Sequence, residues 1–171
     1  RHLRLVVDGG EWTRLRSLLT ELKDSDLVPE IQLEIESLVR IDDINFALQE
    51  KITHAMKRGR VQGTPTQLDV SDVSVTDLNA ALAFAGQRNI HSRADQSLIH
   101  TAELLRDLRL LLLATDYKKV SQRLKGAGVT TISPAGKDEF LLIQSAVECL
   151  DMLEELAEAI LLDGPTGNPG M

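Results

Sequence analysis

The strongest constraint on the fold is a run of apolar residues at helical spacing in the middle of the chain. They recur every three or four positions, at Leu98, Ala102, Leu105, Leu108 and Leu112. This spacing places them on one face of an α-helix. Aromatic residues make up only 3% of the sequence, so leucine, isoleucine, valine and alanine must build the core. Leucine and alanine favour helices, whereas sandwiches and barrels use more aromatic and β-branched residues, so the sequence predicts an all-α protein.

The same periodicity predicts further helices along the chain. We expect them over residues 11–23, 30–60, 76–86, 93–114, 117–125 and 137–162. The second is either one long helix or two joined at residues 42–43, and Pro29 fits its first turn. Thr76 is a suitable N-cap for the third helix, and residues 115–116 for the fifth. Residues 110–113 are apolar on every side of their helix, so we expect that part to be covered from several directions.

The last four helices carry a weak internal repeat, because short Leu/Ala patterns recur after 42 to 44 residues. The matched positions are Leu78 with Val120, Leu82 with Leu124, Ala85 with Ala127, and residues 98–102 with 142–146. Each half is a short helix followed by a long one. A period near 40 residues is typical of helical pairs that bury their faces against neighbouring pairs. We therefore predict stacked antiparallel helical pairs, either as a solenoid-like helical repeat or as an irregular helical bundle.

The pattern along the chain predicts three segments. We expect residues 1–10 to form a short extended segment, residues 11–163 a single helical domain, and residues 164–171 a disordered tail. Within the domain, glycine, proline and polar residues predict a long loop at about 59–75, with either a short strand or a helical turn near 68–73. The chain begins without a methionine and ends in a Gly/Pro-rich stretch, so we expect it to be part of a longer protein.

No residue pattern predicts catalysis, a metal site or a cofactor site. The histidines are His2, His54, His91 and His100, and none of them has the spacing of the helical zinc-protease motif. The single cysteine, Cys149, has acidic neighbours that disfavour a reactive thiolate, and we expect it to be a buried core residue. We therefore expect no enzyme activity and no cofactor.

The net charge of −7 is concentrated near the C-terminus. Residues 137–163 hold Lys137 against eight acidic residues, so this segment accounts for the whole net charge. Such an acidic end disfavours nucleic acid as its partner. A single cysteine suits a reducing compartment, and the longest apolar run, residues 110–114, is far too short to span a bilayer. We expect a cytoplasmic protein without membrane insertion.

Two charged stretches are candidate partner-binding surfaces. The first is basic, with Lys51, Lys57, Arg58 and Arg60 and no acidic residue between them. It could contact phosphate or an acidic protein, although cations at a helix C-terminus also stabilise the helix dipole. The second is acidic, with Glu148, Asp151, Glu154, Glu155 and Glu158. It is either a solvated helix face or a docking site for a basic partner, including the basic end of a second copy.

The sequence predicts many helices and contains no residue pattern typical of catalysis. This combination favours a binding surface over an active site. We therefore expect a non-enzymatic helical scaffold segment that mediates protein–protein interaction within a larger protein. The first alternative is a nucleic-acid- or phosphate-contacting module that uses residues 51–60 and a second set of cations. That set is Arg106, Arg109, Lys118, Lys119, Arg123 and Lys125. The second alternative is a regulatory or oligomerisation domain of a multidomain enzyme. Among partners, we expect a protein first, a second copy next and nucleic acid last.

Leu105, Leu108 and Leu112 are predicted to lie in the core. Leu108→Ala should lower the free energy of unfolding by about 2–5 kcal/mol, because it removes buried methyl groups and leaves a cavity. Chemical denaturation measures this difference. A loss below ~1 kcal/mol would show that the long helix is not central to the fold.

Overall fold

The computed structural model describes residues 12–22, 25, 27–88, 93–127 and 132–164. Its helices are α2 (Trp12–Leu22), α3 (Pro29–Lys57), α4 (Thr76–Gly86), α5 (Arg93–Leu113), α6 (Tyr117–Lys125) and α7 (Pro134–Leu162). Strands β1 (Gln62–Thr64) and β2 (Gln67–Asp69) form one antiparallel hairpin. The predicted all-α class is therefore confirmed. The expected segment 1–10, all but the first residue of the expected tail 164–171, His2 and His91 lie outside the described residues.

The helix ends follow local sequence signals, with one exception. α3 is a single helix of 29 residues, and Pro29 occupies its first turn as predicted. Asp116 caps α6, because its carboxylate accepts a hydrogen bond from the Lys119 backbone N–H at 3.2 Å. Thr76 is not an N-cap, because it is already the first residue of α4. The backbone N–H of Thr76 donates a hydrogen bond to the Ser74 hydroxyl at 3.3 Å. The side chain that satisfies an N–H at the start of α4 therefore belongs to a residue two positions before the helix.

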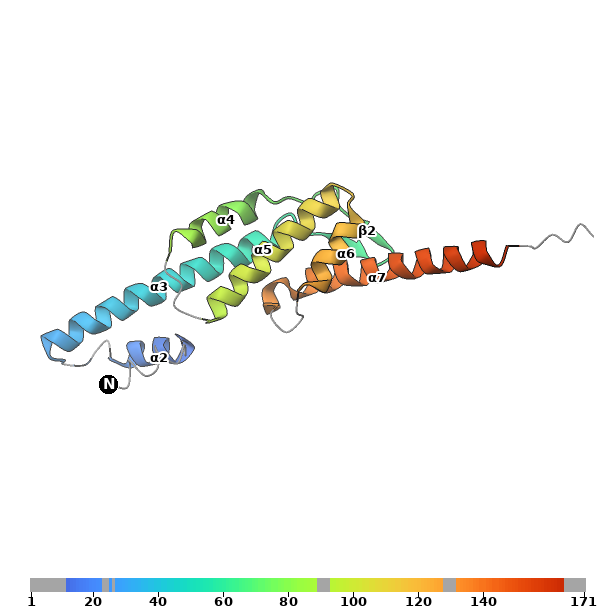
Figure 1. The fold of residues 1–171 in the computed structure, drawn as a ribbon. Coiled ribbons are helices and arrows are strands. Elements are labelled where there is room, and N and C mark those ends of the chain that lie inside the picture. The colour runs from blue at the N-terminus through green and yellow to red at the C-terminus, as the bar shows by residue number, and fades with distance from the viewer. Residues whose placement is uncertain (1–11, 23–24, 26, 89–92, 128–131, 165–171) are drawn as a thin grey trace, which may run out of the picture.

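The two longest helices, α3 and α7, leave the body in opposite directions. In Figure 1, the first half of α3 extends on one side together with α2, and the second half of α7 extends on the other. Between these ends, α3 contacts α4, α5 and α7, and α5 contacts α6 and α7. Because α3 contacts helices of both later pairs, the arrangement is an irregular bundle rather than a row of pairs that touch only their neighbours.

The short–long repeat is present in the helices. α4 and α6 have 11 and 9 residues, whereas α5 and α7 have 21 and 29. Matched positions are buried in both halves: Leu78 with Val120, Ala85 with Ala127, and Ala102 with Ala146. The repeated apolar spacing therefore reflects the same kind of burial in both pairs.

Most buried apolar residues form one core between α3, α4, α5, α6 and the first half of α7. Leu105 and Leu108 are fully buried and Leu112 is 1% exposed, so their predicted place in the core is confirmed. Leu110 and Leu113, in contrast, are each 46% exposed. The expectation that this part of the helix is covered from several directions is therefore wrong. The helices that contact α5 leave one side of its last turn open to solvent.

Residues 59–75 contain more structure than the predicted loop. The β1–β2 hairpin lies within them, and Gly63 in β1 has φ +105°, a left-handed conformation that favours glycine. Val61 is buried, and the partly buried Leu68 and Val73 pack against the core. Of the predicted segment 68–73, only Leu68 and Asp69 lie in a strand, β2, which begins one residue earlier. Apolar residues before, within and after the hairpin thus attach it to the helical body.

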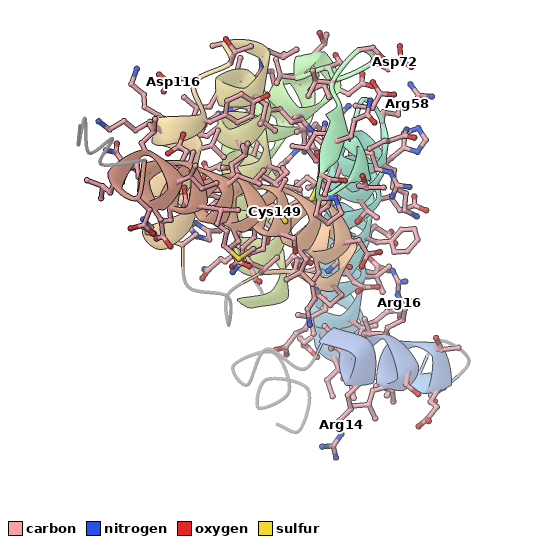
Figure 2. All side chains as sticks on the ribbon, turned by 90° about the vertical axis from the view of Figure 1, so that its right-hand side faces the viewer. Arg14, Arg16, Arg58, Asp72, Asp116 and Cys149 are labelled. Carbon is pink, nitrogen blue, oxygen red and sulfur yellow. The ribbon has the colours of Figure 1, made fainter. Side chains whose placement is uncertain are left out.

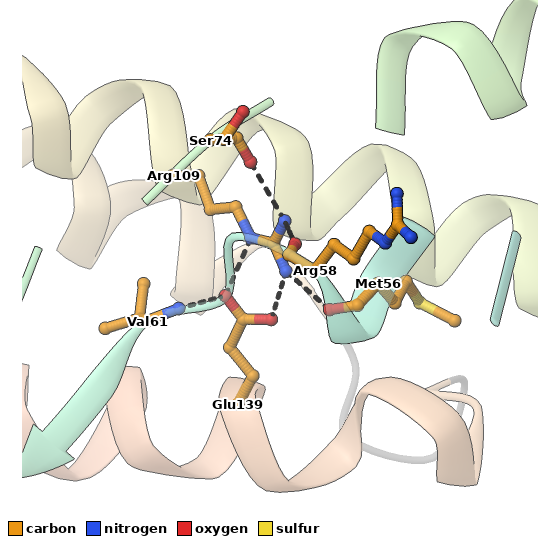
Figure 3. Close-up of polar contacts among 6 residues, drawn as sticks. All are labelled: Met56, Arg58, Val61, Ser74, Arg109 and Glu139. Carbon is orange, nitrogen blue, oxygen red and sulfur yellow. Dashed lines mark hydrogen bonds and ion pairs between the residues drawn. The ribbon is translucent and has the colours of Figure 1, made fainter. Parts of the chain in front are cut away.

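A buried ion pair joins α5 to α7 (Figure 3). The Arg109 side chain on α5 is fully buried, and Glu139 on α7 is 5% exposed. Arg109 Nε donates to Glu139 Oε1 at 2.8 Å, and Nη2 donates to Oε2 at 2.7 Å. Such bidentate pairing is among the strongest hydrogen-bonding arrangements in proteins. It fixes the position of α7 along α5.

The same pair satisfies backbone groups of the segment that links α3 to α4. Arg109 Nη2 donates to the Met56 carbonyl at 2.7 Å, and Nη1 donates to the carbonyls of Arg58 and Ser74 at 2.9 and 3.0 Å. The Val61 backbone N–H donates to the Glu139 carboxylate at 2.9 Å. All five N–H donors of the guanidinium group are therefore used. The Met56 carbonyl, in the last turn of α3, and the carbonyl of its C-cap Arg58 thus gain a hydrogen-bond donor.

Glu139→Ala should lower the free energy of unfolding by about 3–5 kcal/mol, because it leaves the Arg109 charge buried without its partner. Asp77→Ala is the matched control. Asp77 and Arg58 form an exposed ion pair with 3.9 Å between Oδ2 and Nη1, and its loss should cost less than ~1 kcal/mol. Urea denaturation measures both differences. Equal losses would show that the buried pair does not hold the elements together.

The first turn of α7 packs closely on α5 at Gly136. A Cβ at this position would lie 2.7 Å from Thr101 Cγ2 and 2.8 Å from Leu105 Cδ1. Gly136→Ala should therefore destabilise the protein by about 1–3 kcal/mol, despite the higher helix propensity of alanine. Gly86→Ala is the control, because no atom lies within 4 Å of its added Cβ.

The Gly86→Ala variant should be neutral or more stable by up to ~1 kcal/mol. Thermal denaturation of both variants at one protein concentration makes the comparison. A Gly136→Ala variant as stable as the original chain would show that Thr101 and Leu105 move aside freely.

Candidate partner-binding surface

The described residues contain no group of three or more His, Cys, Asp or Glu side chains placed to hold a metal ion. Two carboxyl groups, the exposed Asp69 and the partly exposed Asp116, have a lowered pKa. Hydrogen bonds from the Ser71 hydroxyl and backbone N–H lower the pKa of Asp69, and those from the Lys119 side chain and backbone N–H lower the pKa of Asp116. Both groups serve local turns and stay ionised at neutral pH. Neither is therefore placed for acid–base chemistry.

The four cations of the basic stretch do not form one continuous contact surface. Lys51 Nζ lies 4.8 Å from the centre of the Phe84 ring, and Arg58 pairs with an aspartate of α4. Lys57 lies with Lys51 on an exposed side of α3, whereas Arg60 borders a small cavity whose other charged residues are acidic. Among residues 47–88, all of them described, no large apolar side chain is strongly exposed. The cations of this stretch therefore have no large exposed apolar side chain from residues 47–88 beside them.

The second set of cations is largely paired within the protein. Arg109 is the buried half of the ion pair described above, so it cannot contact a nucleic acid, and this part of the alternative is wrong. Arg106 and Arg123 both pair with Asp107, at 2.8 and 3.1 Å. Lys119 pairs with the N-cap of α6 at 2.7 Å. Of the six cations, Lys118 and Lys125 are exposed and form no ion pair with a described residue, so two are left for a phosphate backbone.

The acidic residues lie on the second half of α7, the part of the helix that leaves the body in Figure 1. Glu148, Asp151, Glu154, Glu155 and Glu158 are all exposed there. The same part of the helix carries large apolar side chains that were not predicted as a site. They are between 37% and 87% exposed: Leu150, Met152, Leu153, Leu156, Ile160, Leu161 and Leu162. We call residues 148–163 the projecting end.

Apolar and acidic side chains occupy different sides of the projecting end. With about 100° of rotation per residue, the apolar side chains between Cys149 and Leu161 span a sector of roughly 200°, and the acidic ones between Glu148 and Glu158 span about 120°. Leu162 and Asp163, at the end of the helix, do not follow this division. Leu153, Leu156 and Ile160 lie near the centre of the apolar sector, Glu154 flanks one edge and Glu155 the other. A helix on the surface of a domain usually needs an apolar stripe of only about 100° or somewhat more. The projecting end could therefore be covered from more than one direction.

The apolar sector does not simply continue the buried side of α7. The buried side is centred near Ile143, and the exposed sector is centred near Ile160, roughly 100° further around the helix. Cys149 lies in the exposed sector and is only partly buried. Its predicted place as a buried core residue is therefore wrong, since its position lies about 120° around the helix from the buried side. The sequence shows the helical spacing of the apolar residues along α7. The signal that separates its buried side from its exposed apolar sector is the rotation of the apolar positions around the helix.

A groove of about 670 Å³ between α2 and α3 is a second apolar surface. Leu19, Leu22 and Ile35 contribute to its lining. Its charged residues include both signs, and Arg16 Nε donates to Asp42 Oδ2 at 2.7 Å (Arg16 is labelled in Figure 2). Because charges of its rim pair with one another, this groove shows no preference for a partner of one charge.

Comparison with models of protein families, with curated protein sequences and with solved structures finds no match to this chain. Among the described residues, no helix combines the length and the apolar character that crossing a lipid bilayer requires. The surface of the chain itself is therefore the basis for a functional proposal.

Proposed function

We propose that this chain is a non-enzymatic helical scaffold segment that binds a protein partner through the projecting end of α7. The exposed apolar sector is the observation that carries the proposal. Met152, Leu153, Leu156 and Ile160 are each at least 57% exposed. Soluble proteins rarely keep a large apolar surface with a polar rim in water unless a partner covers it.

The spacing of the exposed residues suits a helix that lies in a partner's groove. Leu153, Leu156, Ala157 and Ile160 are at positions i, i+3, i+4 and i+7, the pattern of anchor residues in helix-in-groove binding. The first half of the same helix is held in the body by the Arg109–Glu139 pair. The projecting end is therefore already helical before binding, which reduces the entropy lost on association.

Self-association through this end is the main alternative, and it corresponds to an oligomerisation domain. A nucleic-acid-contacting function has less support, since most of the proposed second set of cations is paired and the projecting end would repel phosphate. Sedimentation velocity of the chain alone and nuclease treatment of captured material separate these cases from a protein partner.

Replacing Leu153 and Leu156 with glutamine tests the proposal directly. Glutamine keeps the helix propensity of leucine while removing apolar surface, so the free energy of unfolding should change by less than ~1 kcal/mol. Affinity capture from lysate of the source cells, read by quantitative mass spectrometry, should recover specific proteins with the original chain and lose them with the double variant. Leu33→Gln is the matched control, because Leu33 is 67% exposed on α3.

The control should retain the same proteins as the original chain, with and without nuclease. If the original chain, the double variant and the Leu33→Gln control all recover the same proteins, docking through α7 is contradicted. Recovery that disappears with nuclease would favour the nucleic-acid alternative.

A further inference from the structure

We infer that the partner of the projecting end is a basic helical surface, in which two helices form an apolar groove with Lys or Arg on both rims. This inference rests on the proposed docking through α7 and adds the chemistry of the partner. It is carried by three observations: the width of the apolar sector, the distribution of charge around it, and the poor fit of a second projecting end and of two other described surfaces of this chain.

The width of the sector argues for two covering helices. One helix in a two-stranded coiled coil covers a narrow seam made by two positions in every seven. On the projecting end, Leu150, Leu153, Ala157 and Ile160 form that seam, but Cys149, Met152 and Leu156 lie beside it. Met152 and Leu156 are 60% and 57% exposed. A single partner helix would leave them in water, whereas a two-helix groove would cover them.

The charge around the sector has one sign. The projecting end contains six acidic residues and no basic residue. Asp151, Glu154, Glu155 and Glu158 form no ion pair with any residue that the structure describes. Since Glu154 and Glu155 flank opposite edges of the apolar sector, carboxylates line both rims. Cations on both rims of the partner groove would match them, and like charges there would oppose binding.

A second copy of this chain fits the projecting end poorly. Pairing two such ends through their apolar sectors would bring the carboxylates at the sector edges, Glu154 and Glu155 of both copies, close together. The seam also extends over only about two heptads, whereas a self-standing coiled coil usually needs three or four.

Two further surfaces among the described residues do not complement the projecting end either. The groove between α2 and α3 is lined by Glu36, Asp42 and Asp43 as well as by Arg16 and Arg40. The basic stretch at residues 51–60 lacks strongly exposed large apolar side chains. Neither of these two surfaces combines apolar contact with an excess of cations, so neither complements the projecting end.

Three designed helical hairpins provide the probes. They share one leucine-lined groove and differ only at the rim positions, which are lysine, glutamine or glutamate. Binding to the full 171-residue chain is followed by fluorescence anisotropy of the labelled hairpin. Cys149 supplies a second readout, because it is the single cysteine of the chain and lies in the apolar sector. Its rate of reaction with a thiol reagent should fall when the groove covers it.

We expect the lysine-rimmed hairpin to bind at least about tenfold more tightly than the glutamine-rimmed one at low salt, because several individually weak rim pairs act together. The preference should shrink towards 1 M salt, where the Debye length is only about 3 Å. Glu154→Gln with Glu155→Gln should reduce this preference, measured as the ratio of the two affinities. The same change at Glu36 and Glu103, which are exposed elsewhere, should have no effect.

Equal affinity for the lysine and glutamine rims would overturn the inferred partner charge while leaving docking through α7 intact. Concentration-dependent dimers that Leu153→Gln and Leu156→Gln abolish would assign the end to a second copy and overturn the inference. Absence of both binding and Cys149 protection with every hairpin would also overturn it. In that case, capture of proteins that depends on Leu153 and Leu156 would still support the proposed function.

Discussion

The buried guanidinium group of Arg109 is the constraint on which the rest of the structure depends. A charge removed from water is tolerated only when its partner and its hydrogen bonds are complete. Completing them requires Glu139 from α7 and carbonyl groups from the segment between α3 and α4 at the same time. The Val61 N–H on the Glu139 carboxylate adds the start of the hairpin. One side chain therefore couples three parts of the chain that are far apart in sequence.

This coupling determines where α7 points. Its first turns are fixed by Glu139, by the close approach of Gly136 to Thr101 and Leu105, and by the Ser133 N–H that donates to the Thr101 hydroxyl at 2.8 Å. The helix then continues beyond the helices it packs against, as Figure 1 shows. Because one continuous helix contains both halves, fixing the first half aims the second. Contacts of the first turns of α7 with the core thus determine the direction of the projecting end, and no loop lies between the two.

Local sequence patterns predicted the features that depend on neighbouring residues in the chain, namely helix bounds and the apolar face of a helix. Helix α6 has the predicted bounds, and the stripe through Leu108 lies in the core. The ion pair was not predictable in this way, because Arg109 and Glu139 are 30 residues apart and each resembles an ordinary surface charge. Exposure of Leu110 and of the apolar side of the projecting end depends on where neighbouring helices stop. Amphipathic spacing shows that a face is apolar, but it does not show what covers it.

The burial of Glu139 also changes how the charge of the protein is distributed. Of the net charge of −7, residues 148–163 contribute −6. Glu139 is neutralised inside the body by Arg109, and Arg106, Arg123 and Lys119 are paired locally. The long-range field of the chain is therefore centred on the projecting end, beside the apolar sector. Such a field raises the rate at which an oppositely charged surface arrives, while the apolar contacts determine how long it stays.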